Sequence, residues 1–127
     1  MSDIPKVGEF CWNELATSNV QAAKDFYGKV FGWKFSEHDT GDMKYTIIKQ
    51  NDKDIGGIWA LPKEKEKQIP PHWMSYILVE KLEDALKKAT DNGATIVKEP
   101  TNAGDMGRLA IITDPTGAYI ALWQPIR

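Results

Sequence analysis

The amino-acid sequence predicts an α+β domain made of two copies of a unit with the order strand, helix, strand, strand, strand (βαβββ). In each half of the chain, apolar residues at helical spacing follow one strand-like run and precede three more. The two halves also match each other at a nearly constant offset. We therefore expect one duplicated domain over residues 1–127, with modules at about 6–62 and 71–125.

The first module has one helix signal between strand-like runs. Residues 8–17 alternate in polarity in places and lead into Ser18, which has the spacing of a capping box with Gln21. Gly32 is a suitable stop, because glycine readily adopts the left-handed conformation that ends helices. The apolar helix stripe consists of Val20, Ala23, Phe26, Tyr27, Val30 and Phe31. Strands are expected over residues 33–38, 44–50 and 54–61, with turns at 40–42 and 51–52.

The second module repeats this order after a charged loop and two prolines. A strand is expected over residues 73–79, and a helix that ends at Asn92-Gly93 follows it. Its apolar stripe consists of Leu82, Ala85, Leu86 and Ala89. Further strands are expected over residues 95–98, 108–113 and 118–124. The segment Asp114-Pro-Thr-Gly117 predicts a tight turn between the last two strands.

The duplication rests on the order of elements more than on identities. At an offset of 62, Trp12 matches Met74 and Val20 matches Leu82, and at an offset of 64 Trp59 matches Trp123. Any α/β chain can be aligned with itself somewhere, so these matches alone are weak. Because the same elements recur in the same order, duplication is the favoured interpretation.

Composition excludes several classes of function. The chain has 16 Lys and Arg against 18 Asp and Glu, a net charge of −2, and no basic stripe of the kind nucleic-acid binders carry. The mixed charges of Lys63–Lys67 indicate a solvated loop. Cys11 is the one cysteine, which favours a reducing, cytoplasmic compartment. We expect no signal peptide and no membrane-spanning helix, since no apolar run approaches about 18 residues.

Two segments carry a resemblance to a known family: Ala22–Trp33, after the first strand, and Asp114-Pro-Thr-Gly117, before the last. In them the chain resembles the vicinal oxygen chelate superfamily, which includes glyoxalase I, extradiol dioxygenases, and fosfomycin- and bleomycin-resistance proteins. It is most similar to the glyoxalase-like branch. The resemblance implies a mixed sheet that curls around a cup, with the helices on the outer face. It also implies pairing of two chains as a homodimer.

The resemblance further assigns positions for a metal. Metal-dependent members bind a divalent ion through His, Glu or Gln on the first and last strands of the modules. These positions fall on Trp12, Met74 and Ala121, and residues 55–61 contain no carboxylate, amide or imidazole. Indole and methyl groups are not ligands, and a thioether is a poor ligand for a hard ion. We therefore expect no metal and no other cofactor.

A rebuilt metal site is the alternative. Glu14 lies two residues from Trp12, and His72 lies two residues from Met74. A shift of two residues keeps a side chain on the same face of a strand. Two ligands without a third or fourth would bind an ion weakly, which favours the metal-free interpretation.

Strand alternation assigns the side chains that would line the cup. The expected ligand-binding residues are Trp12, Glu14, Trp59, His72, Met74, Tyr76, Tyr119 and Trp123. The opposite faces would carry Leu15, Ile77, Val79, Ile120 and Leu122 under the helices. Flat apolar walls with a few polar groups are typical of small-molecule sites, although the same aromatic residues could simply fill the cup. The pair Gly56-Gly57 predicts a bulge or a point of close approach by a ligand or a partner chain.

Glu14 is the central polar candidate, because a carboxylate in a central strand is costly to bury unless it is paired. It could accept hydrogen bonds from a tyrosine or an indole N–H, or pair with Arg108. It could instead orient a cationic or hydroxylated ligand, or act as an acid or base. His72 could lie exposed at the rim. Cys11 is expected on the helix side as a small core residue.

Three functions remain open at this stage. The leading hypothesis is a metal-free protein that binds a flat or aromatic small molecule, as bleomycin-resistance members sequester a toxic compound. The second is an enzyme. It would be a glyoxalase-like lyase or isomerase or a dioxygenase-type enzyme with a rebuilt divalent-metal site, or it would use Glu14 as an acid or base. The third is a structural domain with a filled cup. We expect a small-molecule ligand and a homodimer, with neither nucleic acid nor membrane as a partner.

Overall fold

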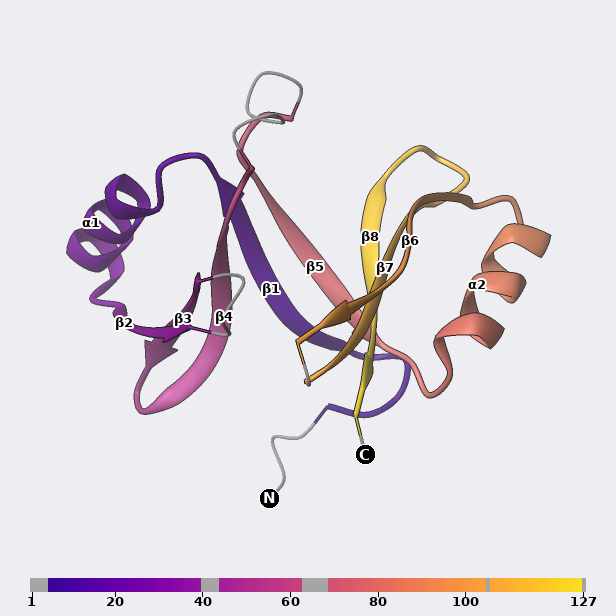
Figure 1. Cartoon of the computed structure of the whole chain (residues 1–127), viewed down its shortest axis with the longest axis horizontal. Coiled ribbons are helices and arrows are strands. Elements are labelled where there is room, and N and C mark those ends of the chain that lie inside the picture. Colours follow the sequence, from indigo (N-terminus) through magenta and orange to yellow (C-terminus); the bar gives the residue numbers. More distant parts are fainter. Residues whose placement is uncertain (1–4, 40–43, 63–68, 105, 127) are drawn as a thin grey trace. The chain divides into compact units, whose positions relative to one another are not determined.

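The computed structural model describes residues 5–39, 44–62, 69–104 and 106–126. Within these ranges the chain forms eight strands and two helices, in the predicted order (Figure 1). They are β1 (Phe10–Thr17), α1 (Val20–Phe31), β2 (Lys34–Asp39), β3 (Lys44–Gln50), β4 (Lys53–Ala60), β5 (His72–Leu78), α2 (Leu82–Asp91), β6 (Thr95–Ala103), β7 (Gly107–Thr113) and β8 (Tyr119–Pro125). The prediction of an α+β chain with two βαβββ modules is confirmed.

Contacts divide the chain into two compact units. One unit is Trp12–Met74, and the other combines the residues up to Cys11 with those from Ser75 onward. The boundaries lie inside β1 and β5, so each of these strands contributes residues to both units. The expected turn at residues 40–42, the charged segment Lys63–Lys67 and the first four residues lie outside the described residues.

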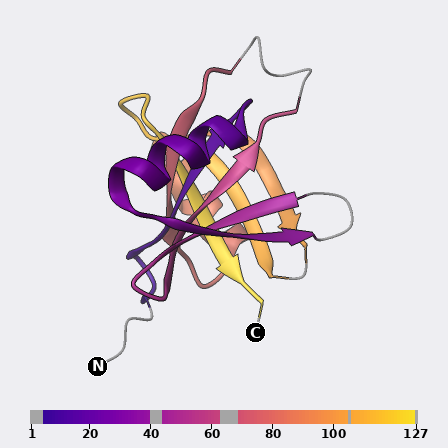
Figure 2. The same cartoon turned by 90° about the vertical axis from the view of Figure 1, so that its left-hand side faces the viewer.

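The Trp12–Met74 unit is a four-stranded mixed sheet with α1 on one face. Its strand order is β2-β3-β4-β1, with antiparallel pairs except for the parallel pair of β4 and β1. The core between sheet and helix consists of Leu15, Ile48 and Ile58, against which Val20, Ala23 and Tyr27 of α1 pack. In Figure 2 the helix lies on the near side of these strands. Leu15 therefore points to the helix side, as alternation predicts.

The cap of α1 differs from the prediction. Asn19, and not Ser18, is the N-cap, and its side-chain oxygen accepts a hydrogen bond from the backbone N–H of Ala22 at 3.0 Å. Gln21 does not complete a capping box, because its amide donates to Asp25 instead. Asn and Ser are equally favourable at the N-cap, so the sequence alone did not distinguish Ser18 from Asn19 as the N-cap residue. Gly32 ends the helix with a positive φ of 75°, as predicted.

The second unit repeats this architecture. Its strand order is β5-β8-β7-β6, with β5 and β8 parallel. The core under α2 consists of Leu82, Leu86, Ala110, Ile112 and Leu122, with Ile77, Val79 and Ile120 packed against it. The prediction that these strand residues face the helix is confirmed. The strand β6 is five residues longer than expected and contains Pro100, which an edge strand with register shifts tolerates.

The Asp114-Pro-Thr-Gly117 turn is held by one carboxylate. Oxygen Oδ1 of Asp114 accepts hydrogen bonds from the Thr116 hydroxyl at 2.6 Å and from the backbone N–H groups of Thr116 and Ala118 at 2.8 and 3.1 Å. The Thr116 hydroxyl and these N–H groups lower the pKa of the Asp114 carboxyl. A carboxyl with a lowered pKa stabilises the fold above its unfolded pKa, and this stabilisation is lost as pH falls through the folded pKa.

Replacing Asp114 by alanine is therefore expected to lower the midpoint of thermal unfolding at neutral pH. The difference from the wild type should narrow below about pH 3.9, where the unfolded wild-type carboxyl begins to bind a proton. Thermal unfolding followed by circular dichroism across the acid range measures this. A difference that stays constant with pH would show that the carboxylate charge contributes nothing to the turn.

No helix within the described ranges is both long and apolar enough to cross a membrane.

Candidate functional site

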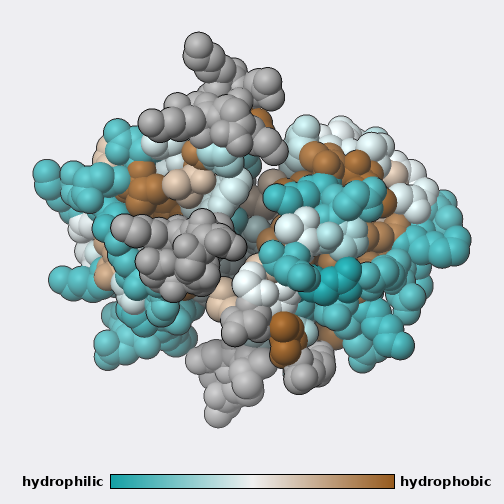
Figure 3. Space-filling view, in the orientation of Figure 1, coloured by the Kyte–Doolittle hydropathy of each residue, from teal (hydrophilic) through white to brown (hydrophobic). Residues whose placement is uncertain are grey.

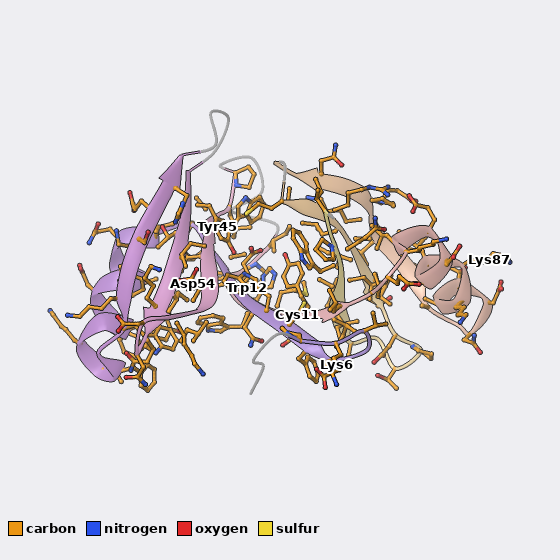
Figure 4. The ribbon with its side chains drawn as sticks, turned by 90° about the horizontal axis from the view of Figure 1, so that it is seen from below. Lys6, Cys11, Trp12, Tyr45, Asp54 and Lys87 are labelled. Carbon is orange, nitrogen blue, oxygen red and sulfur yellow. The ribbon has the colours of Figure 1, made fainter. Side chains whose placement is uncertain are left out.

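Three side chains of the Trp12–Met74 unit form a chain of hydrogen bonds. The indole Nε1–H of Trp12 donates to the Tyr45 hydroxyl at 2.9 Å. That hydroxyl in turn donates to Oε2 of Glu14 at 2.6 Å. Figure 4 shows Trp12 and Tyr45 next to each other. An indole, a phenol and a carboxylate thus meet at one place, on the sheet face opposite Leu15 and α1.

The sheet register explains how these residues meet. Trp12 and Glu14 lie two residues apart on β1, so their side chains share a face. Tyr45 lies on β3, and β4 separates β3 from β1. The Tyr45 side chain must therefore cross β4 to reach Glu14. Glu14 is paired in the sheet with Gly57 of β4.

Gly57 makes this crossing possible. A Cβ atom placed on Gly57 would lie 1.8 Å from the Tyr45 hydroxyl oxygen and 2.3 Å from its Cζ. No side chain fits there while the Tyr45 ring lies in its present position. The sequence predicted a bulge or a close approach at Gly56-Gly57. The group that approaches Gly57 is a tyrosine of the same unit, whereas the expected group was a ligand or a partner chain.

Burial makes the hydrogen bonds energetically significant. Tyr45 is only 9% exposed, and Glu14 and Trp12 are half-buried. A half-buried carboxylate needs donors, and a hydrogen bond to a charged group contributes about 1.5–3 kcal/mol. Of the partners that the sequence allowed for Glu14, a tyrosine is found. Arg108 instead pairs with Glu83 on the surface, where it lowers the pKa of the Glu83 carboxyl.

The remaining predicted residues of this unit differ in their surroundings. Trp59 is half-buried and is paired with Tyr45 in the sheet register. Met74 is 8% exposed. His72 is half-buried, and its Nδ1 lies 2.9 Å from the carbonyl oxygen of Pro70. One ring nitrogen of His72 is therefore in contact with the backbone of the segment that precedes β5.

In the other unit the structure brings two of the three predicted residues together. The rings of Tyr76 and Trp123 meet edge to face, with centroids 6.5 Å apart and an interplanar angle of 77°. The Trp123 ring lies over Gly107, where an added Cβ would be 2.7 Å from Cζ2 of Trp123. Tyr119 is 62% exposed, so it takes no part in this cluster. Tyr76, by contrast, is 5% exposed.

The positions that the resemblance assigns to a metal do not have suitable donors. The Trp12 nitrogen carries a hydrogen that it donates to Tyr45, and Ala121 is fully buried without any side-chain donor. Within the described residues, no group of three or more His, Cys, Asp or Glu side chains is placed to hold a metal ion. This donor set does not fit a divalent ion, which prefers oxygen and imidazole ligands.

Cys11 has the properties of a structural thiol. It is half-buried, and burial raises the pKa of its thiol, although a backbone hydrogen bond opposes that shift. A raised pKa keeps the thiol protonated at neutral pH, and the protonated form is a weak nucleophile. This agrees with its expected role as a packing residue.

Sequence reasoning missed Tyr45 as a site residue. One signal was available, because Tyr45 matches Leu109 of the second module at the offset that matches Trp59 to Trp123. The pair of positions 45 and 59 corresponds to the pair 109 and 123, and both pairs are adjacent across strands. The position of Tyr45 opposite Trp59 could therefore have identified Tyr45 as a candidate. The repeat could not have shown that the Tyr45 side chain crosses β4.

Comparisons with known proteins give a family model and several relatives. Residues 9–122 match the model of the Glyoxalase/Bleomycin resistance protein/Dioxygenase superfamily. A Mycobacterium tuberculosis protein named "Putative glyoxylase CFP32" is 33% identical over 118 residues, which cover 91% of this chain and 45% of the relative. The Streptomyces peucetius protein named "Anthracycline biosynthesis protein DnrV" is 25% identical over 129 residues, covering 92% of this chain and 47% of the relative. The chain thus spans about half the length of these relatives.

Solved structures agree on the fold. Methylmalonyl-CoA epimerase from Mycobacterium tuberculosis superposes with a TM-score of 0.67 at 15% identity, covering 100% of this chain and 94% of the epimerase. A hypothetical protein, BH1468 from Bacillus halodurans, superposes with a TM-score of 0.70 at 14% identity, covering 96% and 97% of the two chains. At such identities the likeness concerns architecture alone.

Proposed function

This chain belongs to the Glyoxalase/Bleomycin resistance protein/Dioxygenase superfamily, and we propose that within it the chain is a metal-free protein that binds a flat, hydroxylated aromatic molecule. The observation that carries the proposal is the hydrogen-bonded array of Trp12, Tyr45 and Glu14. The cytoplasm is the compartment we propose for it, since the chain has a single cysteine.

The array has the chemistry of a small-molecule site. Such sites combine apolar, often aromatic walls with a few fixed polar groups that orient the ligand. Trp12 supplies a flat indole, and Trp59 lies beside Tyr45 in the sheet register. Glu14 supplies an acceptor for a ligand hydroxyl or cation. Because Tyr45 holds the carboxylate in place, little conformational entropy is lost when a ligand binds it.

The ligand class follows from these groups and from one relative. A carboxylate and a phenol next to an indole suit a planar ring system that carries hydroxyl groups. The Streptomyces peucetius relative is named for anthracycline biosynthesis, and anthracyclines are planar, hydroxylated and cationic. A hydroxylated anthraquinone and an anthracycline are therefore the first compounds to test.

The test is a titration of tryptophan fluorescence with a dihydroxyanthraquinone and an anthracycline, backed by calorimetry. We expect saturable quenching with one site per chain. The Tyr45→Phe variant should bind at least about tenfold more weakly, because the carboxylate loses the donor that orients it and about 1.4 kcal/mol corresponds to tenfold. The response should be the same after treatment with a chelator and after addition of divalent ions.

Tyr27→Phe is the matched control, because Tyr27 also accepts an indole N–H, from Trp73 at 3.1 Å, but donates to no carboxylate among the residues that the structure describes. It should bind like the wild type. Equal weakening in both variants, or no saturable binding by the wild type, would contradict the proposal. Affinity that depends on a divalent ion would instead indicate a rebuilt metal site with Glu14 and His72.

An enzyme is the second candidate, favoured by one observation. The Tyr45 hydroxyl donates to Glu14 at 2.6 Å, so a carboxylate base and a phenolic proton lie in contact. Such a pair could move a proton on a bound substrate without any metal. Mass spectrometry and NMR of the bound compound after incubation distinguish the two functions. A binding protein returns the compound unchanged, whereas an enzyme exchanges or relocates one of its protons.

A further inference from the structure

His72 lies on the same face of the sheet as the hydrogen-bonded array and belongs to the same compact unit. It is the first residue of β5, which lies next to β1 in the strand order. The next residue, Trp73, donates its indole N–H to the hydroxyl of Tyr27 at 3.1 Å, and Tyr27 packs on the core beneath α1. Trp73 therefore points to the α1 side. Because successive side chains of a strand alternate between faces, His72 points to the opposite face, which carries Glu14.

The carbonyl oxygen of Pro70 determines which nitrogen of the neutral His72 ring carries the hydrogen. This oxygen lies 2.9 Å from Nδ1 of His72, and a carbonyl oxygen can only accept a hydrogen bond. Nδ1 therefore carries the hydrogen. A neutral imidazole has one hydrogen for its two ring nitrogens, so Nε2 has a lone pair and is an acceptor.

Two prolines hold that carbonyl group in place. The ring of Pro70 fixes its own φ angle, and Pro71 restricts the backbone of the residue before it. The Pro70 carbonyl is thus oriented before His72 contacts it, so little conformational entropy is lost in the contact. Nε2 of His72, by contrast, has no hydrogen-bond partner within the described residues. A half-buried nitrogen whose lone pair has a fixed direction is a suitable acceptor for a ligand.

The repeat provides an internal comparison for the two acceptors. At the offset of 62, His72 corresponds to Phe10 and Glu14 corresponds to Tyr76, so the other unit has neither an imidazole nor a carboxylate at these positions. Figure 3 shows hydrophilic residues (teal) on the side of the molecule that carries α2, at the right, where an exposed helix surface is normally polar. The fold alone does not require two half-buried acceptors on one sheet face, which points to a function for them.

We propose that Nε2 of His72 is a second acceptor of the ligand site, and that the site therefore selects ligands with two hydrogen-bond donors. This inference rests on the proposed function. One hydroxyl of the ligand donates to Glu14, and another donates to His72. A site built to bind a hydroxyl rejects an analogue that lacks it, because the acceptor is then left unpaired. A carboxylate in place of a hydroxyl has no hydrogen to donate and is repelled by Glu14, so the site also discriminates against anionic ligands.

NMR of the imidazole nitrogens tests the first part of the proposal without any ligand. At about pH 8.5, where an ordinary histidine is neutral, His72 should show a protonated Nδ1 and an unprotonated Nε2. The other histidine of the chain, His38, is the control, because its Nε2 lies 3.1 Å from the Ser36 hydroxyl, which can donate or accept. The His38→Asn variant assigns the two sets of signals. A neutral His72 ring with its hydrogen on Nε2 would overturn the proposal.

Ligand titrations test the second part, with a dihydroxyanthraquinone, a monohydroxyanthraquinone and an anthraquinone carboxylate as probes. A chelator is present throughout, so that no metal ion occupies Nε2. The wild type should bind the dihydroxy compound at least about tenfold more tightly than either of the other two.

Two substitutions at position 72 separate the acceptor from the rest of the ring. His72→Asn keeps an N–H near the place of Nδ1 but has no acceptor at the place of Nε2, so it should lose the preference for the dihydroxy compound over the monohydroxy compound. His72→Gln, whose amide oxygen reaches the place of Nε2, should retain part of that preference. His38→Asn is the matched control on the exposed strand β2 and should bind all three probes like the wild type.

The possible results distinguish this inference from the proposed function. If His72→Asn binds the dihydroxy compound as tightly as the wild type does, the inference is wrong and the proposed function stands. Equal weakening of all three probes in His72→Asn would also overturn it, because the loss would then not depend on the second hydroxyl. A wild type that prefers the carboxylate would contradict the selection for donors. Absence of saturable binding to the wild type would overturn both proposals.

Discussion

Replacing Gly57 by alanine is expected to lower the free energy of unfolding by about 2–4 kcal/mol and to abolish ligand binding. The added Cβ would lie 1.8 Å from the Tyr45 hydroxyl and less than 3 Å from two further atoms of its side chain. The ring must therefore leave its place over β4. Both hydrogen bonds of the Tyr45 hydroxyl, from Trp12 and to Glu14, are then lost together.

Denaturant unfolding and the fluorescence titration measure the two effects. Gly28→Ala is the control, because a Cβ at Gly28 would meet its nearest atoms at 3.6 Å, an ordinary contact. Gly28 lies inside α1, so alanine there should raise stability by about 0.5–1 kcal/mol. If Gly57→Ala is as stable as the wild type and binds ligand equally well, Tyr45 does not need to cross β4.

The second large effect concerns the contact between Tyr45 and Glu14. Tyr45→Phe removes a donor from a half-buried carboxylate and should cost about 1–3 kcal/mol of stability. Glu14→Ala removes the acceptor of the phenolic hydrogen and should cost a similar amount of stability. If the contact is strong, the double variant will be more stable than the sum of the single losses implies, with a coupling of about 1–2 kcal/mol.

Chemical denaturation of the four proteins of this cycle gives the coupling energy. Tyr27→Phe again provides the comparison, since it loses one exposed hydrogen bond from Trp73 and should cost under about 1 kcal/mol. Additive losses in the Tyr45 and Glu14 variants would mean that the 2.6 Å contact contributes nothing to folding. Additivity of their effects on ligand affinity would likewise mean that the two groups do not act as a pair.

The secondary structure could be predicted from the sequence because its determinants are local. The apolar stripe of α1 and its stop at Gly32 come from residues that are neighbours in the chain. The change of N-cap from Ser18 to Asn19 shows the limit of local reasoning, since both residues are good caps. The greater length of β6 depended on pairing with β7, which lies beyond the reach of a local pattern.

The candidate site was only partly predictable. Alternation along β1 placed Trp12 and Glu14 on one face and Leu15 on the other, and the structure agrees. Tyr119 has the same parity as Trp123, yet it lies near the end of its strand and is mostly exposed. The alternation of side chains along a strand predicts the face of the sheet on which a side chain lies. It does not predict whether other residues bury that side chain.

The sequence by itself determined the duplicated βαβββ order, the two helices and the face of each central strand. These properties follow from the periods of the backbone, 3.6 residues in a helix and two in a strand. Only the tertiary structure decided that Tyr45 is the partner of Glu14. That contact depends on the order β3-β4-β1 and on a register that puts Gly57 beside Glu14. The strand register brings together Tyr45 and Glu14, which are 31 positions apart in the chain, and the local periodicity of the sequence does not determine this register.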